Sequence, residues 1–294
     1  MSPRSAEPLR ARLGELVRSR RANAGAPAAP ASSPEAAGAD PRARKRRART
    51  PRAHEGVEAF LPGGEWRDAR GRAVYVHERL RGDIERRRDH WGRLPTPPPG
   101  ESELASLAAM GLERVLFLDL ETCGLSSSPV FLAGTMHWNG DDFVLRQYFA
   151  RDYAEEPALL GAVHEQSRGF EVLVTFNGKS YDAPFLAARA LVHGVTLALP
   201  RHHVDLLHAA RRRWRGELAD CRLQTIERHV CGRVRSGDVP GSDVPGLYHD
   251  SIRRGDPWAL VPVFHHNLLD VITMAEILHA LCKPVRPRGL EWNG

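Results

Sequence analysis

The segment that decides the fold is VLFLDLE, residues 115–121, in which an apolar run ends in two acidic residues. A continuous apolar run of strand length is typical of a strand buried in the centre of a sheet. Alternate residues of a strand point to one face, so Asp119 and Glu121 share a face and Leu120 points away. Two adjacent carboxylates repel each other and are costly to bury without a cation. The segment therefore predicts a central strand that either binds a divalent metal ion or simply ends in acidic residues.

The chain downstream of this strand predicts a mixed sheet. Residues 130–138 and 142–149 have strand character, and the turn Asn139-Gly140-Asp141 between them is a hairpin signal. Strands and helices then alternate along the chain. The predicted strands are 172–176 and a short one near Val204, and the predicted helices are 155–168, one from about 183, 206–215, 223–231 and 257–281, with a Gly- and Pro-rich loop at 236–246. Antiparallel strands followed by alternating elements predict an α/β fold with a mixed β-sheet flanked by helices.

The first hundred residues are basic, and the remainder of the chain is mildly acidic. Residues 1–100 hold 22 basic and 12 acidic residues, a net charge of +10, whereas the remainder has a net charge of −4. Ala, Pro, Ser and Arg dominate residues 22–51, so we expect residues 1–56 to form a disordered basic extension. Its six basic side chains between Arg42 and Arg49 are either a solvated linker or an arm that binds phosphates without reading sequence.

Three further segments complete the predicted organisation. Residues 57–100 form a short lead-in with two strands that pair around Gly63-Gly64, followed by the proline-rich linker LPTPPPG. The main domain is expected over 110–283, with a C-terminal tail at 284–294. No apolar run approaches the ~20 residues of a membrane span, and the first residues lack the apolar stretch of a signal peptide. The four cysteines have no CxxC spacing, which argues against a zinc knuckle or a disulfide framework.

Two more carboxylates add to the pair on the first strand. Asp182 follows the strand and loop VTFNGKSYD, and open α/β sheets bind ligands at the carboxyl ends of their strands. The alternative is that Asp182 caps the helix that begins with Ala183. Asp270 lies inside an apolar helical segment, where a carboxylate is unexpected on structural grounds alone. Because Mg²⁺ and Mn²⁺ prefer oxygen ligands, the four carboxylates predict a site in which two such ions promote phosphodiester hydrolysis.

Polar residues near these acids are candidates for proton transfer and substrate binding. His266 precedes Asp270 by four residues, an offset of about 40° around a helix, whereas His265 is offset by about 140°. We therefore predict that His266 accepts the proton of the attacking water, and that His265 is an ordinary surface or core residue. Asn177 and Lys179 are candidates for substrate contacts, and Lys179 is either a phosphate ligand or an exposed loop cation.

Six segments in order resemble one known family. LDLETCGL, FLAGT, VTFNGKSYDAPFL, HVDLLHAARR, LQTIERHV and HNLLDV occur between residues 112 and 283. They resemble the YprB-like branch of the DEDD superfamily of 3′–5′ exonucleases, which have the ribonuclease H-like fold. The resemblance implies two Mg²⁺ or Mn²⁺ ions, a DNA or RNA substrate with single-stranded or frayed 3′ ends, and the bacterial cytoplasm. By position it implies metal ligands at Asp119, Glu121, Asp182 and Asp270.

The sequence departs from the family pattern at the proton acceptor. Superfamily members carry a tyrosine four residues before the last Asp or a histidine five before it, and here both positions are histidine. The sub-class therefore stays open between His266 and His265. Asp205 also matches the family wording, and we expect it to cap the helix that begins at Leu206, with metal binding as the alternative. A catalytically silent nucleic-acid-binding module and an endonuclease remain as alternative functions.

Overall fold

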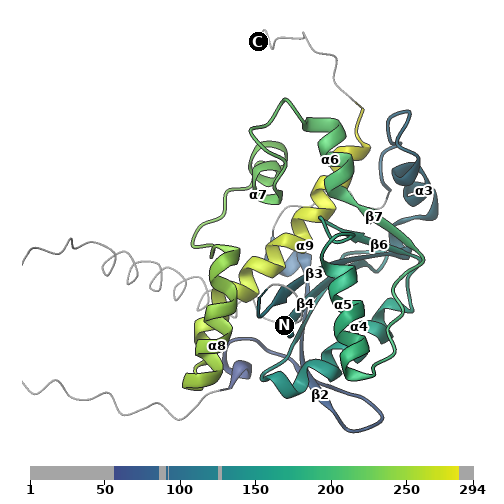
Figure 1. The fold of residues 1–294 in the computed structure, drawn as a ribbon. Coiled ribbons are helices and arrows are strands. Elements are labelled where there is room, and N and C mark those ends of the chain that lie inside the picture. The colour runs from purple at the N-terminus through teal and green to yellow at the C-terminus, as the bar shows by residue number, and fades with distance from the viewer. Residues whose placement is uncertain (1–55, 86–90, 92, 125–127, 285–294) are drawn as a thin grey trace, which may run out of the picture.

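Seven strands form one mixed sheet in a computed structural model that describes residues 56–85, 91, 93–124 and 128–284 (Figure 1). The predicted basic extension lies outside the described residues except for Gly56, as does the C-terminal tail beyond Pro284. The strand order is β1-β2-β5-β4-β3-β6-β7. The strands are β1 (Gly64–Arg67), β2 (Ala73–Leu80), β3 (Val115–Thr122), β4 (Val130–Trp138), β5 (Phe143–Phe149), β6 (Val172–Thr175) and β7 (His202–Asp205).

The centre of the sheet is β3, the strand that the apolar run predicted. β3 is antiparallel to β4, with Asp119 opposite Gly134, and parallel to β6, with Phe117 opposite Val174. β6 and β7 are parallel, whereas β1, β2, β5 and β4 alternate in direction. The predicted α/β fold with a mixed, helix-flanked sheet is confirmed.

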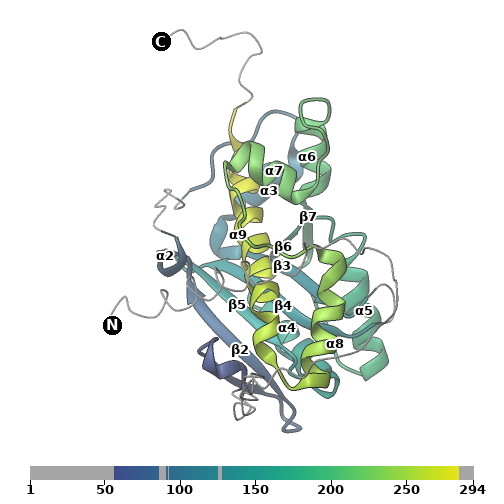
Figure 2. The ribbon, with the colours of Figure 1, turned by 90° about the vertical axis from the view of Figure 1, so that its left-hand side faces the viewer.

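Helices cover both faces of the sheet (Figures 1 and 2). The long helix α9 crosses one face, and α4 and α5 pack on the other. None of the described helices combines the length and apolar composition that crossing a bilayer requires. The helices are α2 (Arg81–Ile84), α3 (Ser102–Met110), α4 (Glu156–Ser167), α5 (Asp182–His193), α6 (Leu206–Trp214), α7 (Leu223–Ile226), α8 (Val244–Arg254) and α9 (Val261–Cys282), with short 3₁₀ turns at Val57–Ala59, Leu112–Arg114, Tyr153–Glu155, Gly241–Asp243 and Pro257–Leu260 and a π-helical turn at Glu227–Cys231.

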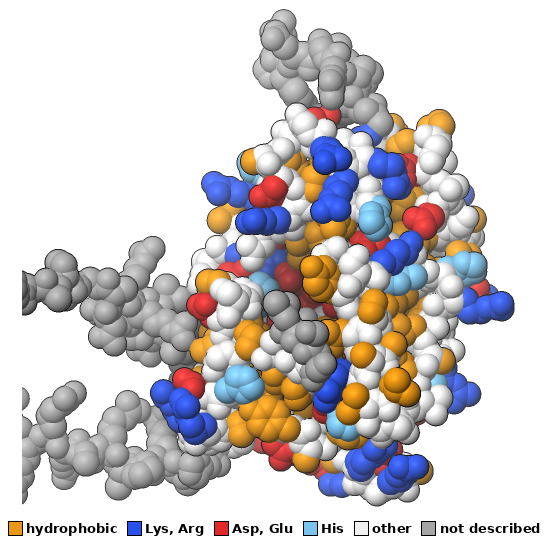
Figure 3. Space-filling model, viewed as in Figure 1, with side chains coloured by type: hydrophobic (Ala, Val, Ile, Leu, Met, Phe, Trp, Pro, Cys, Tyr) orange, Lys and Arg blue, Asp and Glu red, His pale blue; other side chains and the backbone are white. Residues whose placement is uncertain are grey.

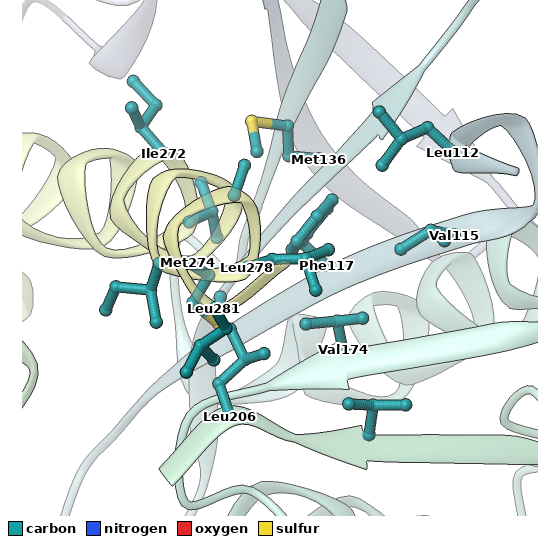
Figure 4. Close-up of a cluster of buried hydrophobic side chains, with 14 of the residues drawn as sticks. Leu112, Val115, Phe117, Met136, Val174, Leu206, Ile272, Met274, Leu278 and Leu281 are labelled. Atoms are coloured by element: carbon teal, nitrogen blue, oxygen red, sulfur yellow. The ribbon is translucent and has the colours of Figure 1, made fainter. Parts of the chain in front are cut away.

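Side-chain alternation along β3 divides the core between the two faces. Phe117 points beneath α9 and packs near Met136 and Leu278 (Figure 4), whereas Leu118 belongs to the cluster under α4. Each of these side chains is almost fully buried, which stabilises the fold by about 1.5–3 kcal/mol per residue. Asp119 and Glu121 continue the Phe117 side of the strand, so their carboxylates face α9.

Three local features differ from the sequence predictions. The hairpin of β1 and β2 turns at residues 68–72 and not at Gly63-Gly64, because the Asp68 carboxylate accepts the backbone N–H groups of Arg70 and Arg72. The predicted helix 223–231 is a single α-helical turn that continues as a π-helix. The helix α8 begins inside the segment predicted as the 236–246 loop, with Pro245 in its first turn.

The lead-in segment joins the same sheet as the remainder of the protein. β2 pairs with β5 from Tyr75 to Leu80, and the buried guanidinium group of Arg81 donates to Glu276 of α9 at 2.8 Å. The Arg81 guanidinium also lies over the Trp91 ring, 4.8 Å from its centroid. Residues 57–81 therefore cover β5, which would otherwise be an exposed edge strand.

We predict that a variant lacking residues 1–56 keeps the melting temperature of the full chain, whereas a variant lacking residues 1–80 melts lower or aggregates. The longer deletion removes the fully buried side chains of Val74 and Tyr75 and exposes the β5 edge. Thermal melts followed by circular dichroism test this, and equal melting temperatures for both deletions would contradict it.

Candidate metal centre

Three elements bring four carboxylates to one end of the sheet. Asp119 and Glu121 come from β3, Asp182 is the first residue of α5, and Asp270 lies in the middle of α9. All four side chains are buried or half-buried. The N-cap position of α5 is held by Tyr181 and Asp182 lies inside the helix as its first residue, so the alternative interpretation of Asp182 as a helix cap is wrong. On the face shown in Figure 3, acidic side chains are visible in the central hollow.

Close packing between α9 and β4 positions Asp119. Asn267, which is fully buried, donates from Nδ2 to the Asp119 carboxylate at 2.9 Å, and its Oδ1 accepts from Gln147 at 3.0 Å. Gly134, in the segment FLAGT, lies opposite Asp119, and a Cβ atom there would stand 2.2 Å from Asn267 Oδ1. Glycine at 134 is therefore required for Asn267 to reach Asp119.

Burial and neighbouring negative charges raise the pKa values of the four carboxylates. Burial raises the pKa of Asp119 well above its ordinary value, and the charges of the other three raise it further. Burial likewise raises the pKa of Glu121 to about 8 and that of Asp182 to about 7. Burial also raises the pKa of Asp270, although the positive charge of Arg235 opposes this. Such elevation is the behaviour of buried carboxylates that lack enough positive charge.

A closed ring of charged side chains joins α9 to the loop before α8. His266 Nδ1 lies 2.7 Å from Asp238, and His266 Nε2 lies 3.5 Å from Asp270. Arg235 closes the ring, since it donates to Asp270 at 2.5 Å and to Asp238 at 3.3 Å. Arg235 also pairs with the buried Glu227 at 2.6 Å. Burial alone would lower the pKa of His266, but the Asp238 hydrogen bond and the nearby carboxylates raise it to about 9.

The donor set fits hard divalent cations, although the present arrangement is not that of a formed metal site. Among the described residues, no three His, Cys, Asp or Glu side chains are placed closely enough to hold an ion as they stand. Asp119 is bonded to Asn267 and Asp270 to Arg235, so two of the four acids already have partners. Four oxygen ligands that repel one another are nevertheless the donors that Mg²⁺ and Mn²⁺ prefer. Asp119, Glu121, Asp182 and Asp270 would hold such ions after Asp270 exchanges its partner.

The remaining candidates lie in the loop before Asp182 and at the start of α6. Asn177 has a positive φ of 68°, and its backbone N–H donates to Asp205 at 2.7 Å. Asp205 also accepts from the backbone of Lys179 and caps α6 through Leu207, which confirms the capping prediction. The Lys179 ammonium group donates to Glu103 at 3.1 Å, and the side chain of Lys179 is partly exposed.

The two adjacent histidines of α9 have different surroundings. His266 is 8% exposed and faces Asp270 and Glu121. The ring of His265 has no hydrogen bond to the residues that the structure describes, and burial lowers its pKa. The geometry thus places His266 at the acidic cluster, as the helical offset predicted.

Sequence reasoning missed Asn267, Asp238 and Arg235. Asn267 stands three residues before Asp270, and this helical spacing would have placed both on one face. Asp238 and Arg235 lie in a loop without periodicity, so no local signal indicates their contacts with α9.

Comparisons with known proteins identify a matching family and individual similar proteins. A family model described as the RNase_H superfamily matches residues 116–282. YprB of Bacillus subtilis (strain 168) is 31% identical over 191 residues, which cover 63% of this chain and 46% of YprB. The chain therefore spans less than half the length of that relative. A family B DNA polymerase from the archaeon Pyrobaculum calidifontis is a structural neighbour with a TM-score of 0.47 and 19% identity, over 57% of this chain and 24% of the polymerase.

We predict that the metal-free protein loses stability as the pH rises from about 5 to about 9. Glu121 and Asp182 have raised pKa values when folded, so the folded state retains protons that the unfolded state releases. The contribution of these two protonated carboxyl groups to the unfolding free energy is complete at acid pH. It is lost as the pH rises through about 7 to 8, the pKa values of the two groups in the folded protein. His266, with its pKa raised to about 9, contributes in the same direction between its ordinary value of 6.5 and about 9.

Melting curves with Mn²⁺ and with EDTA at pH 6 and pH 8 test this. Mn²⁺ should raise the melting temperature more at pH 8 than at pH 6. Each 1 kcal/mol of added unfolding free energy corresponds to about 2–4 °C. Asp119→Asn should melt higher than the native chain in EDTA at pH 8, whereas the exposed control Asp141→Asn should not. An Mn²⁺ effect that is equal at both pH values would refute the prediction.

We also predict that Arg235→Gln binds Mn²⁺ about tenfold more tightly than the native chain, because the guanidinium group competes for Asp270. Arg233→Gln is the matched control, since Arg233 is a neighbouring half-buried arginine that pairs with Glu85 and Glu276. Isothermal titration calorimetry measures both affinities. Weaker binding by Arg235→Gln would show instead that Arg235 holds Asp270 in place for the metal.

Proposed function

Since the chain belongs to the RNase_H superfamily, we propose that it is a metal-dependent nuclease that hydrolyses phosphodiester bonds. The observation that supports this most strongly is the group of four mutually repelling carboxylates with His266 beside them. Such a group is costly to bury and has an evident use only if cations neutralise it. We further propose that two Mg²⁺ or Mn²⁺ ions do so and that the protein works in the bacterial cytoplasm.

In the proposed mechanism the acidic residues hold the metal ions and His266 handles the proton. Bound divalent ions would stabilise the charge on the attacking and leaving oxygens. The Asp238 carboxylate accepts from His266 Nδ1, which leaves Nε2 as the atom that receives the proton of the attacking water. When Asp270 and Glu121 bind metal ions, the negative charges that raise the pKa of His266 would be neutralised. The pKa of His266 would then fall towards neutrality.

The direction of digestion and the substrate are part of the proposal. The DEDD-like spacing of the four acids supports a 3′–5′ exonuclease that acts on single-stranded or frayed DNA or RNA. Glu121 is only 8% exposed, so the bond to be cleaved has to reach below the surface of the protein. A single strand fits this requirement better than an intact duplex. Asn177 and Lys179, on the loop before Asp182, are proposed to contact the substrate.

One observation favours the alternative of a catalytically silent binding module. Arg235 already neutralises Asp270, as an internal cation would in a site that no longer binds metal. A panel of labelled DNA and RNA oligonucleotides with Mg²⁺, Mn²⁺ or EDTA separates the functions, with single and double strands, each end blocked in turn and circular strands included. We expect stepwise shortening from a free 3′ end. Cleaved circles would indicate an endonuclease, and tight binding without cleavage would indicate the silent module.

We predict that Asp119→Ala lowers the rate of cleavage by about 10²–10³-fold or more, the loss typical of removing a key electrostatic group. The variant should melt at the native temperature or above, because it removes one of four repelling charges. The exposed turn residue Asp141 supplies the control Asp141→Ala, which should retain native activity. Full activity of Asp119→Ala would refute the site assignment.

A further inference from the structure

Positive charge is concentrated at the end of α6. Between residues 211 and 222 the chain carries five arginines and two acidic residues, a net charge of +3 in a part of the protein that is otherwise acidic. Arg212 pairs with Glu101, and Arg213 donates to the backbone carbonyl of Pro284 at 3.3 Å. Arg211 and Arg215 are exposed and have no ion pair with the residues that the structure describes. Their guanidinium groups are therefore available to a ligand.

These two arginines line one hollow on the surface. Its volume is about 370 Å³, and its walls also include Gly216, Leu218 and Asp220. The carboxylate of Asp220 accepts the Arg222 backbone N–H at 3.0 Å and lies 3.8 Å from the Arg222 side chain, which is 86% exposed. Asp220, the acidic residue in the lining, is thus already paired with Arg222.

The backbone that carries Arg215 is fixed by the core. Trp214 is 7% exposed and packs in the cluster under α9, and its carbonyl accepts the N–H groups of Glu217 and Leu218. Gly216 turns the chain with a φ of +92°, a conformation that other residues rarely adopt. The backbone next to Arg215 is therefore held in place by Trp214 in the core.

The helix that carries Arg211 begins beside the acidic cluster. Figure 3 shows Arg and Lys side chains gathered over α6 and α7, above the central hollow with acidic side chains. The start of α6 is tied to the cluster, because Asp205 accepts the backbone N–H groups of Asn177 and Lys179. At ~1.5 Å per residue, Arg211 to Arg215 lie about 9–15 Å along the helix from Asp205.

We propose that this arginine hollow binds phosphate groups of a single nucleic-acid strand whose end lies at the acidic cluster. The inference rests on the proposed nuclease function and adds the path of the strand away from the site. Guanidinium groups match phosphate oxygens in shape and charge, and a strand drawn to the hollow would offset its repulsion by the buried carboxylates. The contacts are exposed, so salt weakens them.

The test compares two double variants of the full chain. Arg211→Ala/Arg215→Ala removes the hollow's free arginines, and Arg70→Ala/Arg168→Ala removes two exposed arginines elsewhere, after β1 and after α4. Binding of a fluorescent 12-nucleotide single strand is measured by anisotropy in EDTA at 50–200 mM KCl. The hollow variant should bind about tenfold more weakly at 100 mM KCl. For this variant, the plot of log affinity against log salt concentration should be less steep by about 1.4, which is about 0.7 for each lost phosphate contact.

Several outcomes would overturn the inference. Unchanged affinity and slope in the hollow variant would do so, as would an equal loss in the control variant. A third contrary result is displacement of the labelled strand by a duplex or by polyglutamate as effectively as by an unlabelled single strand. That result would show that the hollow binds polyanions in general and is not a path for a single strand. If the native chain cleaves no oligonucleotide but the binding results are as expected, the proposed activity fails and the strand-binding hollow stands.

Discussion

Mutual repulsion among four carboxylates at the carboxyl end of β3 is the constraint on which the site depends. Asp119 and Glu121 cannot avoid each other, because a strand points alternate residues to one face. Asp182 and Asp270 are brought to the same region by α5 and α9, and burial together with neighbouring carboxylates raises the pKa of each of the four acids. The fold therefore keeps a destabilised group of acids in its interior, and cation binding is the chemistry that would relieve it.

The surrounding structure limits this cost without removing it. Asn267 donates to Asp119, and Arg235 donates to Asp270, so neutral and cationic donors from α9 and its neighbouring loop take part of the negative charge. Asn267 can do this only because Gly134 of β4 leaves room for its side chain. A glycine in the middle of a central strand is unfavourable for the strand itself, and here it permits the contact that orients an acid.

A second set of ion pairs connects the lead-in to the same region. Arg81 follows β2 and pairs with Glu276 of α9, and Arg233 pairs with Glu276 and with Glu227. Glu227 in turn binds Arg235, two residues further along the chain from Arg233. The first strands of the sheet are thus linked through buried charges to the loop that carries Asp238 and Arg235. Breaking one member of such a buried network costs more than an exposed ion pair would.

The sequence alone determined the central strand, the shared face of Asp119 and Glu121, the mixed sheet and the helical offset that favours His266. These follow from local periodicity, which depends only on the backbone geometry of a strand or a helix. Only the tertiary structure decided that Arg235 and Asp238 meet α9, that Asn267 reaches Asp119 past Gly134, and that the start of α6 lies beside the loop before Asp182. The physical reason is that such contacts join residues far apart in the chain through loops that carry no periodic signal.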